Sequence, residues 1–150
     1  MAKGFSFSLQ ALLRFRQSVE EQQLLRLRAA NLKAAQVRNQ IADLNSGLAA
    51  IASAGALELS AGVSGAQLHF DRLCCLAMVQ RRSRLQEDLA LCEQERMQRS
   101  EEFRQARRQR EVLDRLRKQQ FDRYRLQQER QEQRQFDDLL LLRRAFLDHG

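Results

Sequence analysis

The sequence predicts an all-α protein: a long two-helix antiparallel coiled-coil hairpin with an overhanging C-terminal helix. Three observations lead to this prediction. The 150 residues contain no proline, apolar residues recur at alternating spacings of three and four, and four of the six glycines lie between residues 47 and 65. Because proline breaks helices and a glycine-rich stretch is a typical connection, we expect a single elongated domain over residues 1–150.

The first helix is expected at about residues 5–53. Eight apolar positions follow one another there at spacings of three and four, which is the pattern of a coiled-coil seam. A helix with such a stripe needs a partner helix on that side. The seam positions are Leu27, Ala30, Ala34, Val37, Ile41, Leu44, Leu48 and Ile51.

A connector is expected at about residues 54–65. This stretch contains three glycines, two serines and a single charged residue. Each glycine weakens a helix by about 1 kcal/mol relative to alanine. The serines, Ser60 and Ser64, can cap the helix that follows.

The second helix is expected at about residues 66–146. The alternation of three and four continues over eleven positions, of which seven are apolar and four are arginine. Arginines in a seam must extend along their aliphatic stems to reach water, so packing should be uneven. The positions are Met78, Arg82, Leu85, Leu89, Cys92, Arg96, Arg99, Phe103, Ala106, Arg110 and Leu113.

The two arms are unequal. Folding about residue 59 places Ser8 opposite about Arg110 and leaves about 35 residues of the second helix without an intramolecular partner. Two interpretations are open, since either self-association or fold-back of the terminus, or a dedicated partner with a groove or socket, can cover the apolar overhang. Its apolar residues are Val112, Leu113, Leu116, Phe121, Tyr124, Leu126, Phe136, Leu139–Leu142 and Phe146.

The N-terminal stretch FSFSLQALLRFR, residues 5–16, concentrates aromatic and leucine side chains. On this hairpin Phe5 and Phe7 lie where the short arm ends. We therefore expect intramolecular packing to cover at most one face of each ring, and the stretch to mark the root of the overhang.

Charge and hydropathy exclude several classes of protein. The net charge of +7 is interleaved along the helices, which indicates a solvated surface; a footprint for an acidic partner stays open only for Arg104–Lys118. That stretch lacks interleaved aromatic residues, so specific nucleic-acid binding is not expected. The apolar runs are too short to span a bilayer and no secretory signal is recognisable, so we expect a cytosolic location.

Nothing in the sequence predicts catalysis. His69 and His149 have no second ligand type at metal spacing, and no phosphate-binding or nucleophile motif occurs. Cys74, Cys75 and Cys92 are expected to be small apolar fillers of a helix face. We expect no catalytic residue, no cofactor and no metal, and therefore not an enzyme.

The N-terminal spacing F-x-F-x-L-x-x-L-L-x-x-R resembles the opening of the flagellar FliJ family. The C-terminal half agrees, because EVLDRL followed by QFDRYRLQQERQEQRQFDD carries Glu132, Gln133, Arg134 and the pair Asp137 and Asp138 in matching order. The resemblance covers nearly the whole chain, and its N-terminal motif is the most specific part.

The resemblance implies a stalk-like coupling subunit of flagellar type III protein export. It implies an antiparallel two-helix coiled coil similar to the central stalk of rotary ATPases, bound to the hexameric export ATPase, FliI, and to the membrane-embedded export gate, FlhA. Export chaperones are further partners. Such a protein is needed for flagellum assembly, hence for motility and chemotaxis, and is held peripherally at the inner face of the cell membrane at the flagellar base.

The resemblance also implies two binding regions. The gate-binding face falls just after the connector, at Phe70, Leu73, Ala77, Gln80 and Arg84. For Phe70 and Leu73 a second interpretation stays open, in which they are ordinary seam residues. The ATPase-binding hypothesis combines the two ends of the chain: Phe5, Phe7, Leu9, Leu13, Phe121, Tyr124 and Phe136.

Two other functions compete with this one. A stalk protein of a non-flagellar type III secretion system shares the hairpin, although it usually lacks the F-x-F-x-L opening. A homo-oligomeric coiled-coil scaffold shares the seam but has no ATPase partner.

Overall fold

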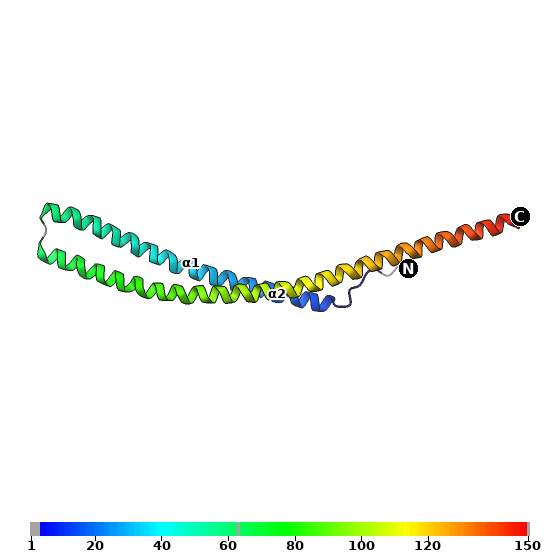
Figure 1. Ribbon diagram of the computed structural model, residues 1–150, viewed down its shortest axis with the longest axis horizontal. Helices are drawn as coiled ribbons and strands as arrows, with labels where there is room; N and C mark the ends of the chain where they lie inside the picture. The colour runs from blue at the N-terminus through cyan, green and yellow to red at the C-terminus, as the bar shows by residue number, and fades with distance from the viewer. Residues whose placement is uncertain (1–3, 63, 150) are drawn as a thin grey trace. The chain divides into compact units, whose positions relative to one another are not determined.

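The computed structural model describes residues 4–62 and 64–149. Over these residues the chain forms two α-helices and no strand: α1, Gln10–Ala61, and α2, Gly65–Asp148. They pack side by side (Figure 1). The predicted all-α antiparallel hairpin is therefore confirmed, and its arms are unequal, with 52 and 84 residues.

The predicted seams are the packed faces of the two helices. All eight positions from Leu27 to Ile51 are buried or half-buried, and so are all eleven from Met78 to Leu113. Small residues form the tightest part, because Ala30, Ala34 and Ala106 are buried. The seam arginines stay half-exposed, as side chains with an apolar stem and a charged head do.

The turn is shorter and later than the predicted connector at 54–65. α1 continues through Ala61, since its packed face extends past Ile51 to the half-buried Gly55 and Glu58. The helix ends at Gly62, whose φ of 80° is left-handed and favours glycine.

A serine starts α2. The amide of Gln67 donates a hydrogen bond of 3.3 Å to Ser64 Oγ, which makes Ser64 the N-cap. Ser60, the other predicted cap, lies inside α1 and donates instead to the carbonyl of Leu57 at 2.7 Å. Of the two serines, only Ser64 caps a helix.

The start of α1 also differs from the prediction of about residue 5. Residues 4–7 are not helical, and the first hydrogen bond runs from the Gln10 amide to the Phe7 carbonyl at 3.1 Å. In a helix, residues two apart point about 200° away from each other, so one face cannot bury both Phe5 and Phe7. Leaving the helix lets both rings turn toward α2.

The later turn changes the pairing of the two helices. Arg110 pairs with Glu20, whereas a fold about residue 59 would have placed Ser8 there. The prediction that α2 has no intramolecular partner beyond Arg110 is therefore wrong. Contacts with the N-terminal segment continue to Phe121 and Tyr124, because a non-helical chain covers about twice the length per residue of a helix.

The described chain divides into two units. One is Glu21–Arg104, and the other joins the residues up to Glu20 with those from Gln105 onward. In the first unit, Lys33 pairs with Glu95 at 3.7 Å and Arg82 donates to Asn45 at 3.1 Å. The expectation of a single elongated domain stays a prediction.

Candidate protein-docking sites

Packing at the chain start is concentrated in an N-terminal cluster, formed by Phe7, Leu13 and Leu113 with Phe5 and Leu116 packed against it. Leu13 is fully buried and Phe7 is 6% exposed. The expectation that Phe7 is covered on only one face is therefore wrong. The cluster fastens the non-helical segment to α2.

Phe5 extends the cluster toward two further aromatic rings. Its centroid lies 5.2 Å from that of Phe121, with the planes at 76°, and 5.6 Å from that of Tyr124. Both arrangements fall within the range of favourable aromatic pairs. Phe5 is half-buried and Phe121 is exposed along part of its ring, so this end of the cluster offers an aromatic surface.

A charged network lies beside the cluster. Arg110 pairs with Glu20 across the helices and with Asp114 along α2, and Arg16 donates to Gln109 at 2.6 Å. The hydrogen bond with Glu20 raises the pKa of Arg110, against the opposing effect of burial. The side chains of Glu20 and Arg110 keep about a fifth of their surface exposed, so this partly buried ion pair links α1 to α2 beside the cluster.

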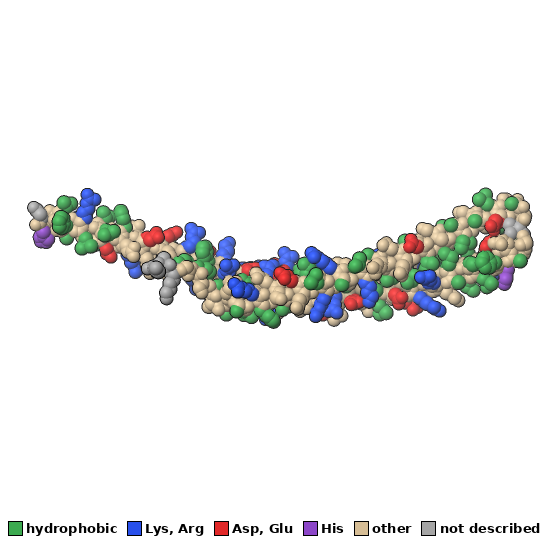
Figure 2. Space-filling view, turned by 180° about the vertical axis from the view of Figure 1, so that it is seen from behind, with side chains coloured by type: hydrophobic (Ala, Val, Ile, Leu, Met, Phe, Trp, Pro, Cys, Tyr) green, Lys and Arg blue, Asp and Glu red, His purple; other side chains and the backbone are tan. Residues whose placement is uncertain are grey.

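Beyond these contacts α2 packs against no other part of the described chain. Every residue from 129 to 149 is exposed; we call this range the exposed segment. Figure 2 shows hydrophobic side chains along it beside Lys and Arg side chains. Its large apolar residues are Phe136, Leu139, Leu140, Leu141, Leu142, Phe146 and Leu147.

The structure brings together most of the predicted ATPase-binding residues. Phe5, Phe7, Leu13, Phe121 and Tyr124 lie in or against the N-terminal cluster. Phe7 and Leu13 are buried there and offer no surface to a partner. Leu9 is exposed, although its carbonyl accepts a hydrogen bond of 2.9 Å from the amide of Leu13. Phe136 lies in the exposed segment. Their role in binding an ATPase stays a prediction.

The predicted gate-binding residues form one line on the surface of α2. Phe70, Leu73, Ala77, Gln80 and Arg84 recur at spacings of three and four and are all exposed; we call them the tip stripe. The interpretation of Phe70 and Leu73 as seam residues is wrong, because the neighbouring Asp71 and Cys74 are half-buried in their place. Gate binding itself stays a prediction.

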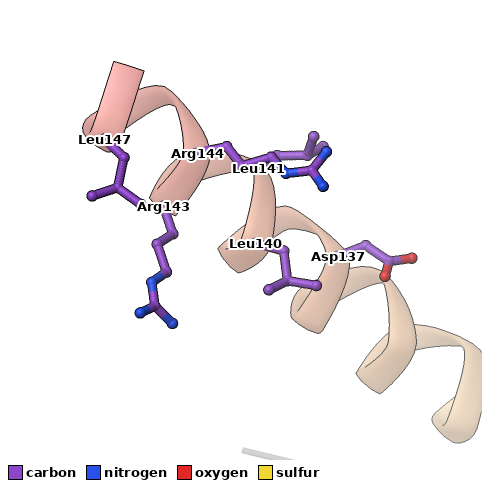
Figure 3. Close-up of a pocket in the computed structure, with 6 residues that line it drawn as sticks. All are labelled: Asp137, Leu140, Leu141, Arg143, Arg144 and Leu147. Carbon is purple, nitrogen blue, oxygen red and sulfur yellow. The ribbon is translucent and has the colours of Figure 1, made fainter. Parts of the chain in front are cut away.

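Two exposed apolar groups were not among the predicted site residues. Leu12 and Phe15 are exposed on α1, and Leu12 lines a shallow hollow with Val112 and Leu113 of α2. Leu139–Leu142 lie in the exposed segment, where Leu140 and Leu141 line a hollow with Asp137, Arg144 and others (Figure 3). Four consecutive leucines in a charged helix were the signal for the second group, because no helix face can bury all four.

A model of the family described as flagellar FliJ protein matches residues 5–147. The chain belongs to the FliJ family. The match confirms the resemblance seen in the terminal motifs, and it assigns the chain to an export-related flagellar role in a family of non-catalytic export components. No curated protein and no solved structure gave a match. Among the described residues, neither helix combines the length and hydropathy that crossing a bilayer requires.

Proposed function

We propose that this FliJ-family chain is a stalk-like coupling subunit of the flagellar type III export apparatus. It binds the hexameric export ATPase, FliI, through the exposed segment, and the export gate, FlhA, through the tip stripe. It works in the cytoplasm, peripherally at the inner face of the membrane, and is needed for flagellum assembly, motility and chemotaxis. Export chaperones are further partners.

One observation carries the proposal. α2 continues well past its last contacts with the N-terminal segment, and its exposed segment carries seven large apolar side chains. An isolated helix owes most of its stability to packing of an apolar face, and exposed apolar patches are typical of interaction sites. A ring that encloses the end of a helix would bury these side chains on all sides of α2.

The tip stripe supplies a second surface that shares no residue with the first. Phe70 and Leu73 expose more than half of their surface, and Gln80 and Arg84 add polar groups along the same line. An aromatic anchor with a polar rim is a common arrangement in protein interfaces. Two separate surfaces on one helix are what a subunit needs to connect an ATPase to a gate.

The first experiment mixes the whole chain at low micromolar concentration with the purified export ATPase. Hydrolysis rate and hexamer formation are measured together, the second by sedimentation velocity. We expect both to rise. No change in either would contradict the proposal and favour the scaffold function instead.

Paired substitutions locate the surface. Leu139→Ala with Leu142→Ala removes side chains that are 65% and 66% exposed in the exposed segment. Leu25→Ala with Leu32→Ala removes side chains of matched exposure, 63% and 62%, from α1. We expect the first pair to reduce stimulation at least about tenfold, as loss of an interface anchor does, and the second to leave it unchanged.

A further inference from the structure

Residues 137–144 read Asp-Asp-Leu-Leu-Leu-Leu-Arg-Arg, and we call them the leucine motif. Two acids stand at one end and two bases at the other, so the order of charges is inverted when the motif is read backwards. All eight residues are exposed. Within the described residues no ion pair involves any of its four charged side chains, and Asp137 accepts one hydrogen bond, from Gln133 at 3.2 Å.

Helix geometry prevents the motif from pairing its own charges. Residues three or four apart are neighbours on a helix surface, whereas Asp137 and Arg144 are seven apart. They lie on the same side of α2, two turns from each other, with Leu140 and Leu141 between them (Figure 3). The acids and bases thus bracket an apolar patch instead of neutralising each other.

The helix macrodipole does not explain this arrangement. Acidic residues are favoured in the first turn of a helix and basic residues in the last turn, and the effect fades within that turn. α2 begins at Gly65, far from Asp137, and its last turn contains no basic residue. Water hydrates the exposed charges, whereas the exposed leucines indicate a partner outside the described chain, and the charges that flank them determine which partner fits.

We propose that the leucine motif pairs with the same motif of a second copy of this chain, in antiparallel orientation. Reversing one copy places Asp137 level with Arg144 of the other, and Leu140 and Leu141 of each copy against each other, because these four residues share one side of the helix. Asp138 and Arg143 flank this contact. The two copies use the same surface, so each contact between an acidic and a basic side chain occurs twice. A parallel pair would instead place acids beside acids and bases beside bases, which is unfavourable.

The contact is small, because it involves little more than two turns of each helix. Interfaces below about 1,200 Å² are typically weak and transient, so the pair should form at high micromolar concentration and dissociate on dilution. It would cover Leu140 and Leu141 until another partner displaces the second copy. Only this last consequence rests on the proposed function; the pairing itself does not.

Sedimentation equilibrium of the full chain, up to about 1 mM at low and high salt, measures the pairing. Asp137→Arg with Asp138→Arg gives an all-basic motif, and Arg143→Asp with Arg144→Asp gives an all-acidic one. We expect each variant alone to self-associate about tenfold or more weakly than the natural chain, since attraction becomes repulsion. Mixing the two variants should restore association.

Orientation is tested by the fourfold variant that exchanges both pairs of charges. An antiparallel pair predicts that homodimers of this variant and of the natural chain are both tighter than the mixed pair, in which acids meet bases only when the two helices are parallel. Glu87 and Asp88 are an exposed acidic pair elsewhere on α2. The control variant Glu87→Arg with Asp88→Arg changes the net charge by the same amount as the first variant and should leave self-association unaltered.

Three results would overturn the proposal: a natural chain that stays monomeric throughout, charge-reversed variants that associate as tightly as the natural chain, or a mixed pair of the natural chain and the fourfold variant that is tighter than either homodimer. No ATPase is present in these measurements. A failure here therefore leaves the stalk function standing, and a failure of ATPase stimulation leaves the pairing standing.

Discussion

The ring of Phe5 meets the ring of Phe121 edge to face, with centroids 5.2 Å apart and planes at 76°. Phe5 comes from a non-helical segment and Phe121 from the middle of α2. With Phe7 and Leu13 buried next to it, this contact determines how far along α2 the hairpin is paired. The exposed segment begins soon after it.

Phe7→Ala should loosen the start of the hairpin. Removing a buried phenylalanine leaves a cavity and costs about 3 kcal/mol or more, which corresponds to about a 100-fold loss of amide protection in the affected region. Hydrogen exchange over residues 10–20 and 105–120 measures this. The tip of the hairpin should keep its protection.

Phe15→Ala is the matched control, because Phe15 lies in the same region and is 57% exposed, against 6% for Phe7. It should change protection by less than about threefold, as surface substitutions usually do. Similar losses for both variants would contradict the packing role of the N-terminal cluster.

Glu58 should make the tip of the hairpin sensitive to pH. Burial, and then the charge of the neighbouring Asp71, raise the pKa of Glu58, and Oε2 is enclosed without a hydrogen-bond partner among the described residues. His69 and Arg72 on α2 are exposed. The folded tip therefore holds the Glu58 proton more tightly than the unfolded chain does.

A raised pKa in the folded state means that the contribution to stability is complete below the unfolded value and is lost as pH rises through the folded value. Amide protection of residues 50–75 should accordingly fall as pH rises from the usual glutamate range, after correction for intrinsic exchange. Glu58→Gln should remove this fall, whereas Glu87→Gln at an exposed position should retain it. A pH dependence that survives Glu58→Gln would exclude this origin.

The two turn-region glycines should respond in opposite ways to alanine. Gly55 lies inside α1 with open space where a Cβ would stand, so Gly55→Ala should stabilise the protein by up to about 1 kcal/mol. Gly62 has a φ of 80°, so Gly62→Ala should destabilise it by about 1 kcal/mol. Urea denaturation measures both, and shifts of the same sign would refute the assigned turn.

The tip stripe should be needed for gate binding and not for folding. Phe70→Ala with Leu73→Ala should weaken binding to the purified export gate protein about tenfold or more, because both are exposed anchors. Circular dichroism should show unchanged helicity. Leu91 and Met97 are also exposed on α2, so Leu91→Ala with Met97→Ala serves as the control. Equal losses of gate-binding affinity in the two double variants would contradict a specific role of the tip stripe.

The seams could be predicted from the sequence because a spacing of three and four has one physical cause, the burial of one helix face. All nineteen predicted seam positions are buried or half-buried. The residues of the tip stripe were predicted from the resemblance to the FliJ family, and spacing alone could not separate them from the seam, because they recur at the same spacings of three and four.

The ends of α1 could not be predicted from local preferences. Gly55 signals a break, yet packing around Ile51 and Glu58 carries the helix past it. At the other end, Phe5 and Phe7 leave the helix so that both rings can face α2, and this depends on Leu113 and Phe121 more than a hundred residues away. The two errors together shifted the predicted pairing and moved the start of the overhang toward Arg110.

ATPase stimulation by a chain that ends at Gln128 tests the central claim most directly. This truncation keeps Phe121 and Tyr124, so the N-terminal cluster and the hairpin should remain folded, which hydrogen exchange verifies. At low micromolar concentration the full chain should accelerate hydrolysis by the export ATPase, and the truncated chain should leave it at the basal rate. Undiminished stimulation by residues 1–128 would contradict the claim that the exposed segment binds the ATPase.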